Sequence, residues 1–319
     1  MATRTTTKKK PAGPHTSSSS EPEGAPGSTK RAVASAGAEG PEAKAPKPGA
    51  DGTESVAGFK MNAESESASS SKLRLPDTSR MRDIAEASFG VAVQAESIIG
   101  TDDRRQISPT TSFPWRANAQ LLITAADNSS WIGTGWFVSP RTLITAGHVV
   151  FIKGSGVPGR DGWVRRIVVI PGRNGAAAPF GSATSTSFRS VTGWSVSGNH
   201  EFDYGAIILP TPLGNTTGWY GYGNYPDAQL IGQTANISGY PGDKPSGTQW
   251  YDARRITAVS ARKVYYNTDT MGGQSGSAVY RIINGGRFAV AVHAYGGSTA
   301  NSGTRINAEV FGNITAWKA

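Results

Sequence analysis

His148 and Ser275 lie in surroundings that suit acyl-transfer chemistry. His148 is in LITAGHVV, where an apolar stretch runs into a Gly-His turn, and Ser275 is in the glycine-rich stretch MGGQSGSAV. Glycines on both sides of a serine permit backbone conformations that direct neighbouring N–H groups to one point, as an oxyanion hole requires. Taken singly, each feature also fits an ordinary strand end or a glycine-rich hairpin.

A histidine that activates a serine must be oriented by a buried carboxylate. Asp203 is the candidate, because it opens the otherwise apolar strand in NHEFDYGAIILP. Glu201 and Asp161 compete for this role, but neither leads so directly into an apolar strand. The chain order His148, Asp203, Ser275 is that of chymotrypsin, and it differs from the orders in subtilisin and the α/β-hydrolases. The three residues together predict a serine hydrolase.

The elements that position these residues are predicted to be short strands. Residues 97–319 consist of short apolar runs separated by Gly, Pro, Asn, Asp and Ser, a pattern typical of an all-β sandwich or barrel. Residues 307–318 differ, because Val310, Phe311, Ile314 and Trp317 recur at helical spacing after Asn307, a plausible N-cap. We therefore expect a β-rich body that ends in one helix.

The composition of the preceding residues predicts a different state. Residues 1–72 are built mainly from Ala, Gly, Pro, Ser, Thr, Lys and Glu, and they cannot bury enough apolar surface to offset the entropy of ordering. We expect this stretch to be disordered. Residues 73–96 regain Leu, Ile, Phe and Val, so they can dock on the body or form a short helix.

Composition also excludes several classes of protein. The chain has no Cys, which excludes a disulfide scaffold, a thiol nucleophile and a cysteine-ligated metal site. No apolar stretch approaches the roughly 18 residues of a membrane span, and the first thirty residues contain no apolar core of a signal peptide. The net charge of +9 arises from scattered residues rather than from a basic stripe, so we expect neither a nucleic-acid partner nor a membrane.

The segments TAGH, DYGAI, SGYPGDK and GGQSGSAV resemble those of the bacterial glutamyl endopeptidases, serine proteases of the chymotrypsin fold that cleave after Glu. The resemblance runs from SIIGTDDRRQI to VFGNITAW and so covers nearly all of residues 97–319. It implies an all-β fold of two six-stranded antiparallel β-barrels with a C-terminal α-helix, spanning residues 97–215 and 216–319. Residues 1–96 would be a largely disordered propeptide of a zymogen.

The resemblance assigns a role to each candidate. His148 would be the general base, Asp203 would orient it, and Ser275 would be the nucleophile. The backbone N–H groups of Gly273 and Ser275 would form the oxyanion hole. His293, in AVAVHAYGG, and Thr270 would line the primary specificity pocket and bind the substrate carboxylate.

Two residues depart from related patterns. Gln274 stands where digestive trypsins carry the Asp that pairs with the new N-terminus, so that activation switch cannot operate in the same form. Val149 stands where some family members have a Cys, so the disulfide of those members is absent. The remaining histidines, His15 and His200, are expected in the disordered leader and on the surface.

The distribution of glutamate supports cleavage after Glu. Residues 1–96 contain nine Glu, whereas residues 97–319 contain two Glu and nine Asp. A protease that cuts after Glu would avoid such bonds in its own body and tolerate them in a disposable leader. We place the processing site at the Glu96–Ser97 bond, because SIIGTDDR looks like the mature start of the family. The freed amino group of Ser97 would lie near the specificity pocket and assist His293.

The expected substrates are proteins and peptides with Glu, and less readily Asp, before the scissile bond. No cofactor is expected to be required, although relatives use structural Ca²⁺, for which Asp102 and Asp103 are candidates. We expect a secreted monomer. Two alternatives stay open: a protease of the same fold with broader specificity, and a catalytically silent binding protein of that fold.

Overall fold

Two β-sheets dominate the computed structural model, which describes residues 13–21, 52–54, 75–89 and 97–319. The first sheet runs in the order β11-β12-β6-β5-β4-β9-β10. Its strands are β4 (Asn118–Thr124), β5 (Ser130–Phe137), β6 (Thr142–Thr145), β9 (Arg166–Pro171), β10 (Ala183–Ser185), β11 (Ser187–Val191) and β12 (Gly205–Ile208). One residue separates β10 from β11, so one continuous stretch forms both edges and the sheet curls into a six-stranded barrel.

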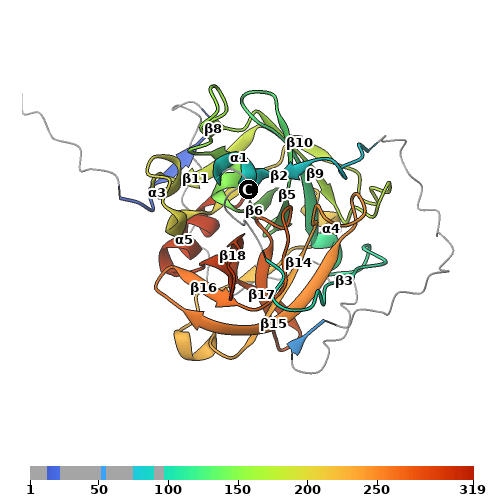
Figure 1. Cartoon of the computed structure of the whole chain (residues 1–319), viewed down its shortest axis with the longest axis vertical. Coiled ribbons are helices and arrows are strands. Elements are labelled where there is room, and N and C mark those ends of the chain that lie inside the picture. Colours follow the sequence, from blue (N-terminus) through green and yellow to red (C-terminus); the bar gives the residue numbers. More distant parts are fainter. Residues whose placement is uncertain (1–12, 22–51, 55–74, 90–96) are drawn as a thin grey trace, which may run out of the picture.

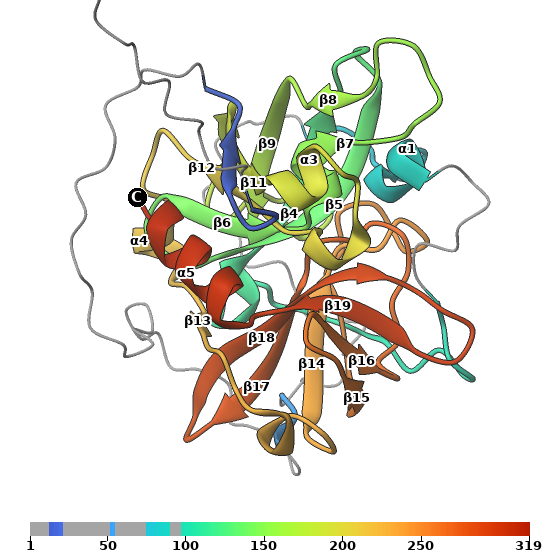
Figure 2. The same ribbon diagram turned by 90° about the vertical axis from the view of Figure 1, so that its left-hand side faces the viewer.

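The second sheet closes through hydrogen bonds between its two end strands. Its order is β18-β17-β14-β15-β16-β19, and β19 also pairs with β18. The strands are β14 (Thr234–Gly239), β15 (Trp250–Val259), β16 (Lys263–Tyr266), β17 (Ala278–Ile283), β18 (Gly286–Tyr295) and β19 (Asn301–Arg305). Figures 1 and 2 show the green first barrel above the orange and red second barrel. The predicted all-β fold with two barrels is confirmed.

Short elements complete the body. These are β3 (Arg105–Gln106), β7 (Phe151–Ile152), β8 (Gly162–Trp163), β13 (Gly221–Tyr222), α2 (Gly147–Val150), α3 (Thr192–Ser195), α4 (Gly214–Thr217), α5 (Ala308–Trp317) and the 3₁₀ turns η2 (Trp115–Ala117), η3 (His200–Phe202) and η4 (Asp227–Gln229). Among the described helices, none is long and apolar enough to span a membrane.

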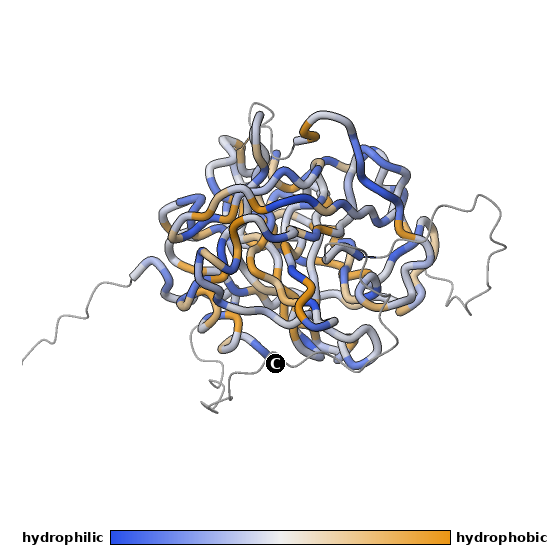
Figure 3. The backbone as a smooth tube through the Cα atoms, turned by 90° about the horizontal axis from the view of Figure 1, so that it is seen from below, coloured by the Kyte–Doolittle hydropathy of each residue, from blue (hydrophilic) through white to orange (hydrophobic). Residues whose placement is uncertain are grey.

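The predicted C-terminal helix is α5. The Asn307 side chain accepts a hydrogen bond from the backbone N–H of Val310 at 3.0 Å and so caps the helix. Val310, Ile314 and Trp317 are buried and belong to one apolar core together with residues of both barrels. Figure 3 shows hydrophobic stretches of the chain through the middle of the body and hydrophilic stretches in several outer segments. The helix therefore packs as its apolar spacing predicted.

Residues 1–96 are called the leader below. The residues of the leader that the structure describes are ordered on the body, in contrast to the expected disorder. Residues 17–19 form β1 (Ser17–Ser19), which pairs with β11, while β2 (Arg82–Asp83) pairs with β5 and leads into α1 (Ile84–Phe89). The body offers open strand edges that the leader can pair with, and buried groups that bind the leader's carboxylates. These contacts supply the stabilisation that the leader's own composition lacks. Docking of residues 75–89, which the sequence left open, is therefore observed.

Candidate active site

His148 and Asp203 form a buried pair at the end of the first barrel. One residue separates strand β6 from α2, which carries His148, and Asp203 lies two residues before the neighbouring strand β12. The Asp203 carboxylate accepts one hydrogen bond from the His148 ring at Nδ1 and another from the His148 backbone N–H, each at 2.8 Å. Both side chains are fully buried. This arrangement fixes the orientation of the imidazole.

Tyr295 is a further partner of Asp203. Its hydroxyl donates to the carboxylate oxygen that contacts the His148 ring. The Thr304 hydroxyl also donates to the Asp203 backbone oxygen at 2.9 Å. Burial acts to raise the pKa of Asp203, but His148 and the Tyr295 hydroxyl outweigh it and hold this pKa below its usual range. Asp203 is therefore ionised at neutral pH.

The loop that carries Ser275 is held by the first barrel. The backbone N–H of Thr134 in β5 donates to the backbone carbonyl oxygen of Ser275 at 2.9 Å. The Thr134 hydroxyl donates to the backbone carbonyl oxygen of Gly273 at 2.8 Å. Gly276 has a φ of +90°, and a Cβ there would lie 2.1 Å from the Thr145 hydroxyl. Only glycine permits this close approach, which brings the serine loop against the strand that leads to His148.

His293 is tied by its backbone to the Ser275 loop. Its backbone N–H donates to the backbone carbonyl oxygen of Ser277 at 2.9 Å, and its own carbonyl oxygen accepts from the Gly276 N–H at 2.8 Å. The ring is fully buried, and its Nδ1 lies 2.5 Å from the Tyr266 hydroxyl. Burial lowers the pKa of His293 to about 3, although the Asp83 carboxylate opposes this shift. His293 is therefore neutral in the full-length chain.

Thr270 and Ser97 lie side by side. The Thr270 N–H donates to the Ser97 oxygen at 3.3 Å, and the buried Thr270 hydroxyl has no hydrogen-bond partner among the described residues. Asn301 accepts from the Ser97 N–H at 3.1 Å and donates to its oxygen at 2.8 Å. Ser97 is thus buried in place; Glu96 lies outside the described residues.

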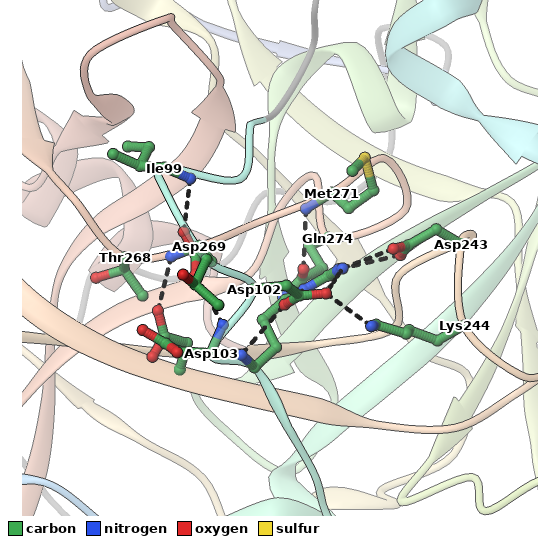
Figure 4. A network of polar contacts seen from close by, with 12 residues as sticks. Ile99, Asp102, Asp103, Asp243, Lys244, Thr268, Asp269, Met271 and Gln274 are labelled. Carbon is green, nitrogen blue, oxygen red and sulfur yellow. Dashed lines mark hydrogen bonds and ion pairs between the residues drawn. The ribbon is translucent and has the colours of Figure 1, made fainter.

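A network of ion pairs fixes the residues after Ser97 (Figure 4). Asp269 accepts from the backbone N–H groups of Ile99 at 2.8 Å and Asp103 at 3.1 Å. The buried Arg104 pairs with Asp102 at 2.9 Å and Asp243 at 2.6 Å, while Arg254 contacts both Asp103 and Asp269 at 2.7 Å. Asp102 and Asp103, the candidates for Ca²⁺, are thus both paired with cations.

Gln274 makes a local contact beside the nucleophile. Its side-chain oxygen accepts a hydrogen bond from the Met271 N–H at 3.0 Å (Figure 4). The side chain is fully buried and its amide nitrogen has no partner among the described residues. A neutral amide here supports the turn of the loop and offers no charge for a free N-terminus.

The competing carboxylates lie elsewhere. Glu201 pairs with Arg262 at 3.1 Å, and Asp161 accepts from the backbone N–H groups of Gly154 and Ser155 in a loop. His200 is exposed and stacks on Tyr295 with ring centres 4.8 Å apart. Within the described ranges, no group of three or more His, Asp or Glu side chains is placed to hold a metal ion.

Residues of the leader cover the candidate site. The sequence did not predict this contact. The Ser275 hydroxyl donates to the carboxylate of Asp83 at 3.3 Å, and Asp83 is 4% exposed. The ring of Phe89 meets that of His148 edge-on, with centroids 5.6 Å apart. The return of apolar residues after residue 72 is the one sequence signal, and it left docking on the body and a short helix both open.

His15, placed by sequence in the leader, also contacts the body. Its Nδ1 lies 3.0 Å from the Tyr204 hydroxyl, and burial lowers its pKa. His15 thus contacts the residue that directly follows Asp203, and its ring also packs edge-on against Phe202, with centroids 4.9 Å apart.

Comparison with known proteins gives the family. The chain matches no family profile. It is 45% identical over 227 residues to a Bacillus subtilis protein named extracellular metalloprotease, covering 70% of this chain and 71% of that protein. It is also 45% identical over 233 residues to the glutamyl endopeptidase of Bacillus licheniformis, covering 70% of this chain and 69% of that protein.

Solved structures agree with the glutamyl endopeptidase relative. A structure of Glu endopeptidase in complex with MPD has a TM-score of 0.59 and 31% identity, covering 68% of this chain and 97% of that one. The protease Anisep from Arthrobacter nicotinovorans, at 17% identity and a TM-score of 0.53, shares the fold. With 45% identity to the Bacillus licheniformis glutamyl endopeptidase, this chain has peptides or proteins as its substrates. The chain belongs to the glutamyl endopeptidase family, as its sequence motifs predicted, and is a serine endopeptidase.

Proposed function

We propose that this endopeptidase cleaves after Glu by means of His148, Asp203 and Ser275. The observation that carries the proposal is the double hydrogen bond that holds His148 on the buried Asp203. The Ser275 oxygen attacks the carbonyl carbon while His148 takes its proton, and the N–H groups of Gly273 and Ser275 receive the oxyanion. His148 then protonates the leaving amine, and water hydrolyses the acyl-enzyme by the same route in reverse.

The preference for Glu rests on His293 and Thr270. With Nδ1 accepting from the Tyr266 hydroxyl, the other ring nitrogen of a neutral His293 carries the proton and can donate to a carboxylate. The buried hydroxyl of Thr270 adds a second donor. Asp83 supports this assignment, because its negative charge already acts on His293 in the full-length chain.

The full-length chain is a zymogen in this proposal. Asp83 accepts the hydrogen bond of the Ser275 hydroxyl, and a carboxylate beside the nucleophile is a poor electrophile. Phe89 packs on His148 at 5.6 Å and on Tyr295 at 5.5 Å, so α1 covers the face by which a substrate would enter. The leader can therefore occupy the site without being cut there.

Cleavage at Glu96–Ser97 would release this cover. Ser97 is already seated on Asn301 and beside Thr270, so cleavage would create its amino group next to the pocket without a large rearrangement. That group is cationic below its ordinary pKa of about 7.7–8.0 and would favour a bound carboxylate. We infer a secreted, monomeric enzyme, in line with the extracellular relative.

The experiment is labelling by a fluorophosphonate, which reacts with an activated serine. Full-length protein with Glu96→Gln, which slows processing, should label slowly, and Asp83→Ala in that background should label at least about tenfold faster. Asp77→Asn is the matched control, because Asp77 is an exposed leader carboxylate. Fast labelling of the unprocessed chain would contradict the zymogen, and no labelling after processing would indicate a silent binding protein.

A further inference from the structure

A carboxylate of the leader is buried in the second barrel, well away from the active site. Glu54 has a fully buried side chain, and its Oε1 and Oε2 accept from Nε and Nη2 of Arg287, each at 2.9 Å. Arg287, at the start of β18, is 2% exposed. Figures 1 and 2 show the blue residues 52–54 at the lower end of the second barrel and α1 in the upper part of the molecule. The two leader contacts are therefore separate.

The surroundings of this carboxylate form a built site. The Tyr280 hydroxyl donates to Oε1 of Glu54 at 3.2 Å, and the Tyr251 hydroxyl accepts from the Glu54 backbone N–H at 2.8 Å. Tyr251 in turn donates to Asn236 at 2.6 Å, and the Asn236 amide donates to the Gly52 oxygen at 3.1 Å. Side chain and backbone of the leader are thus both recognised by buried groups of the body.

Charge explains why the site takes a carboxylate. A guanidinium presents two parallel N–H donors that match the two oxygens of a carboxylate, and such charge-assisted pairs are the strongest hydrogen bonds in proteins. Burial acts to lower the pKa of Arg287, but the hydrogen bonds and charge of Glu54 outweigh it and raise this pKa. A buried cation that loses such a partner is strongly destabilised.

We propose that Arg287 and Tyr280 form a binding site for the side-chain carboxylate of an extended acidic peptide whose backbone Tyr251 binds, and that Glu54 of the leader is its occupant. The leader then binds the second barrel as well as covering the active site. If the leader is cleaved as proposed above, the cleaved fragment can stay bound to this site through Glu54. The bond after Glu54 is also shielded, because its side chain cannot enter the specificity pocket while it is bound to Arg287.

The site can be tested in the full-length chain with Ser275→Ala, so that catalysis does not affect the result. Glu54→Ala should lower the thermal midpoint of unfolding by roughly 6–20 °C, whereas Glu86→Gln, at a half-buried leader glutamate in a surface pair, should leave it nearly unchanged. Glu54→Gln keeps the shape without the charge and serves if the Ala variant does not fold.

Acetate then tests carboxylate binding directly. At matched ionic strength, acetate in place of chloride should raise the midpoint of the Glu54→Ala variant, and the added substitution Arg287→Met should abolish this response. Equal stability of the Glu54 and Glu86 variants, or an equal effect of acetate and chloride, would overturn the proposal. Neither outcome bears on the proposed cleavage after Glu, because the protein tested lacks the nucleophile.

Discussion

The Ser275 hydroxyl donates a hydrogen bond to the carboxylate of Asp83 at 3.3 Å. The two residues are separated by nearly two hundred positions, and both are buried in the full-length chain. The contact places a negative charge beside the candidate nucleophile and near His293, where an acidic substrate group would bind. In the proposed zymogen, the Asp83 carboxylate restrains the nucleophile.

Replacing Ser275 by Ala should abolish turnover without unfolding the protein, because only the nucleophilic oxygen is lost. His148→Ala should cost a similar factor, roughly 10⁴-fold or more in kcat, since members of such a triad act as a unit. Peptidase assays on the processed protein measure both, and circular dichroism checks the fold. Near-normal activity of the Ser275 variant would show that another residue is the nucleophile.

Substitution of His293 by Leu should reduce kcat/KM for Glu substrates far more than for Gln or Leu substrates. The expected loss for Glu corresponds to about 1.5–3 kcal/mol, because a buried hydrogen-bond donor to the substrate charge is removed. Three peptides that differ only in the residue before the scissile bond suffice for the comparison. An equal loss for all three would instead indicate a role in folding.

Tyr295→Phe removes a hydroxyl donor from Asp203 and should lower kcat about tenfold with little change in KM. It should also destabilise the protein by about 1.5–3 kcal/mol, as expected for a hydrogen bond to a charged group. Tyr265→Phe, on the half-buried face of β16, is the control. Steady-state kinetics and urea unfolding separate the two effects; a change in KM alone would argue against positioning of Asp203.

Burial of neutral His293 predicts a pH dependence of stability. Its pKa is about 3 in the folded chain and 6.5 when unperturbed, so between these values the unfolded chain binds a proton that the folded chain does not. Stability should therefore fall as pH decreases from 6.5 towards 3, with a contribution of up to about 1.4 kcal/mol per pH unit. Urea unfolding of the Ser275→Ala chain with and without His293→Gln isolates this contribution. Parallel curves would mean that folding does not lower the pKa of His293.

N-terminal sequencing of active protein should read Ser-Ile-Ile-Gly. Glu96→Gln should slow self-processing, because the residue before the bond would no longer suit the pocket. Gel analysis of full-length protein over time compares this variant with Glu86→Gln. An active enzyme that keeps its leader, or begins many residues from Ser97, would contradict the proposed maturation.

The sequence predicted the body well because its signals are local. Strand-sized apolar runs marked the barrels, and Asn307 followed by apolar residues at helical spacing marked α5. His148 and Asp203 were each identified from the apolar strand beside them, whereas their pairing depends on β6 and β12, which are neighbours in the sheet but distant in the sequence.

The leader contacts were not predictable in this way. Glu54 lies in GTES, where no periodicity or apolar side chain signals burial. Its burial depends on the ion pair with Arg287, which lies more than two hundred residues later. Asp83 and Tyr295 likewise gain their roles only from the packing of segments that are distant in the sequence. Composition described what the leader could bury by itself, but the body supplies the partners.

Cleavage-site profiling of the processed protein with a peptide library tests the central claim most directly. The account predicts cuts after Glu, fewer after Asp, and no cuts by the Ser275→Ala protein prepared in parallel. Cleavage after many unrelated residues, or unchanged cleavage by the Ser275→Ala protein, would contradict it.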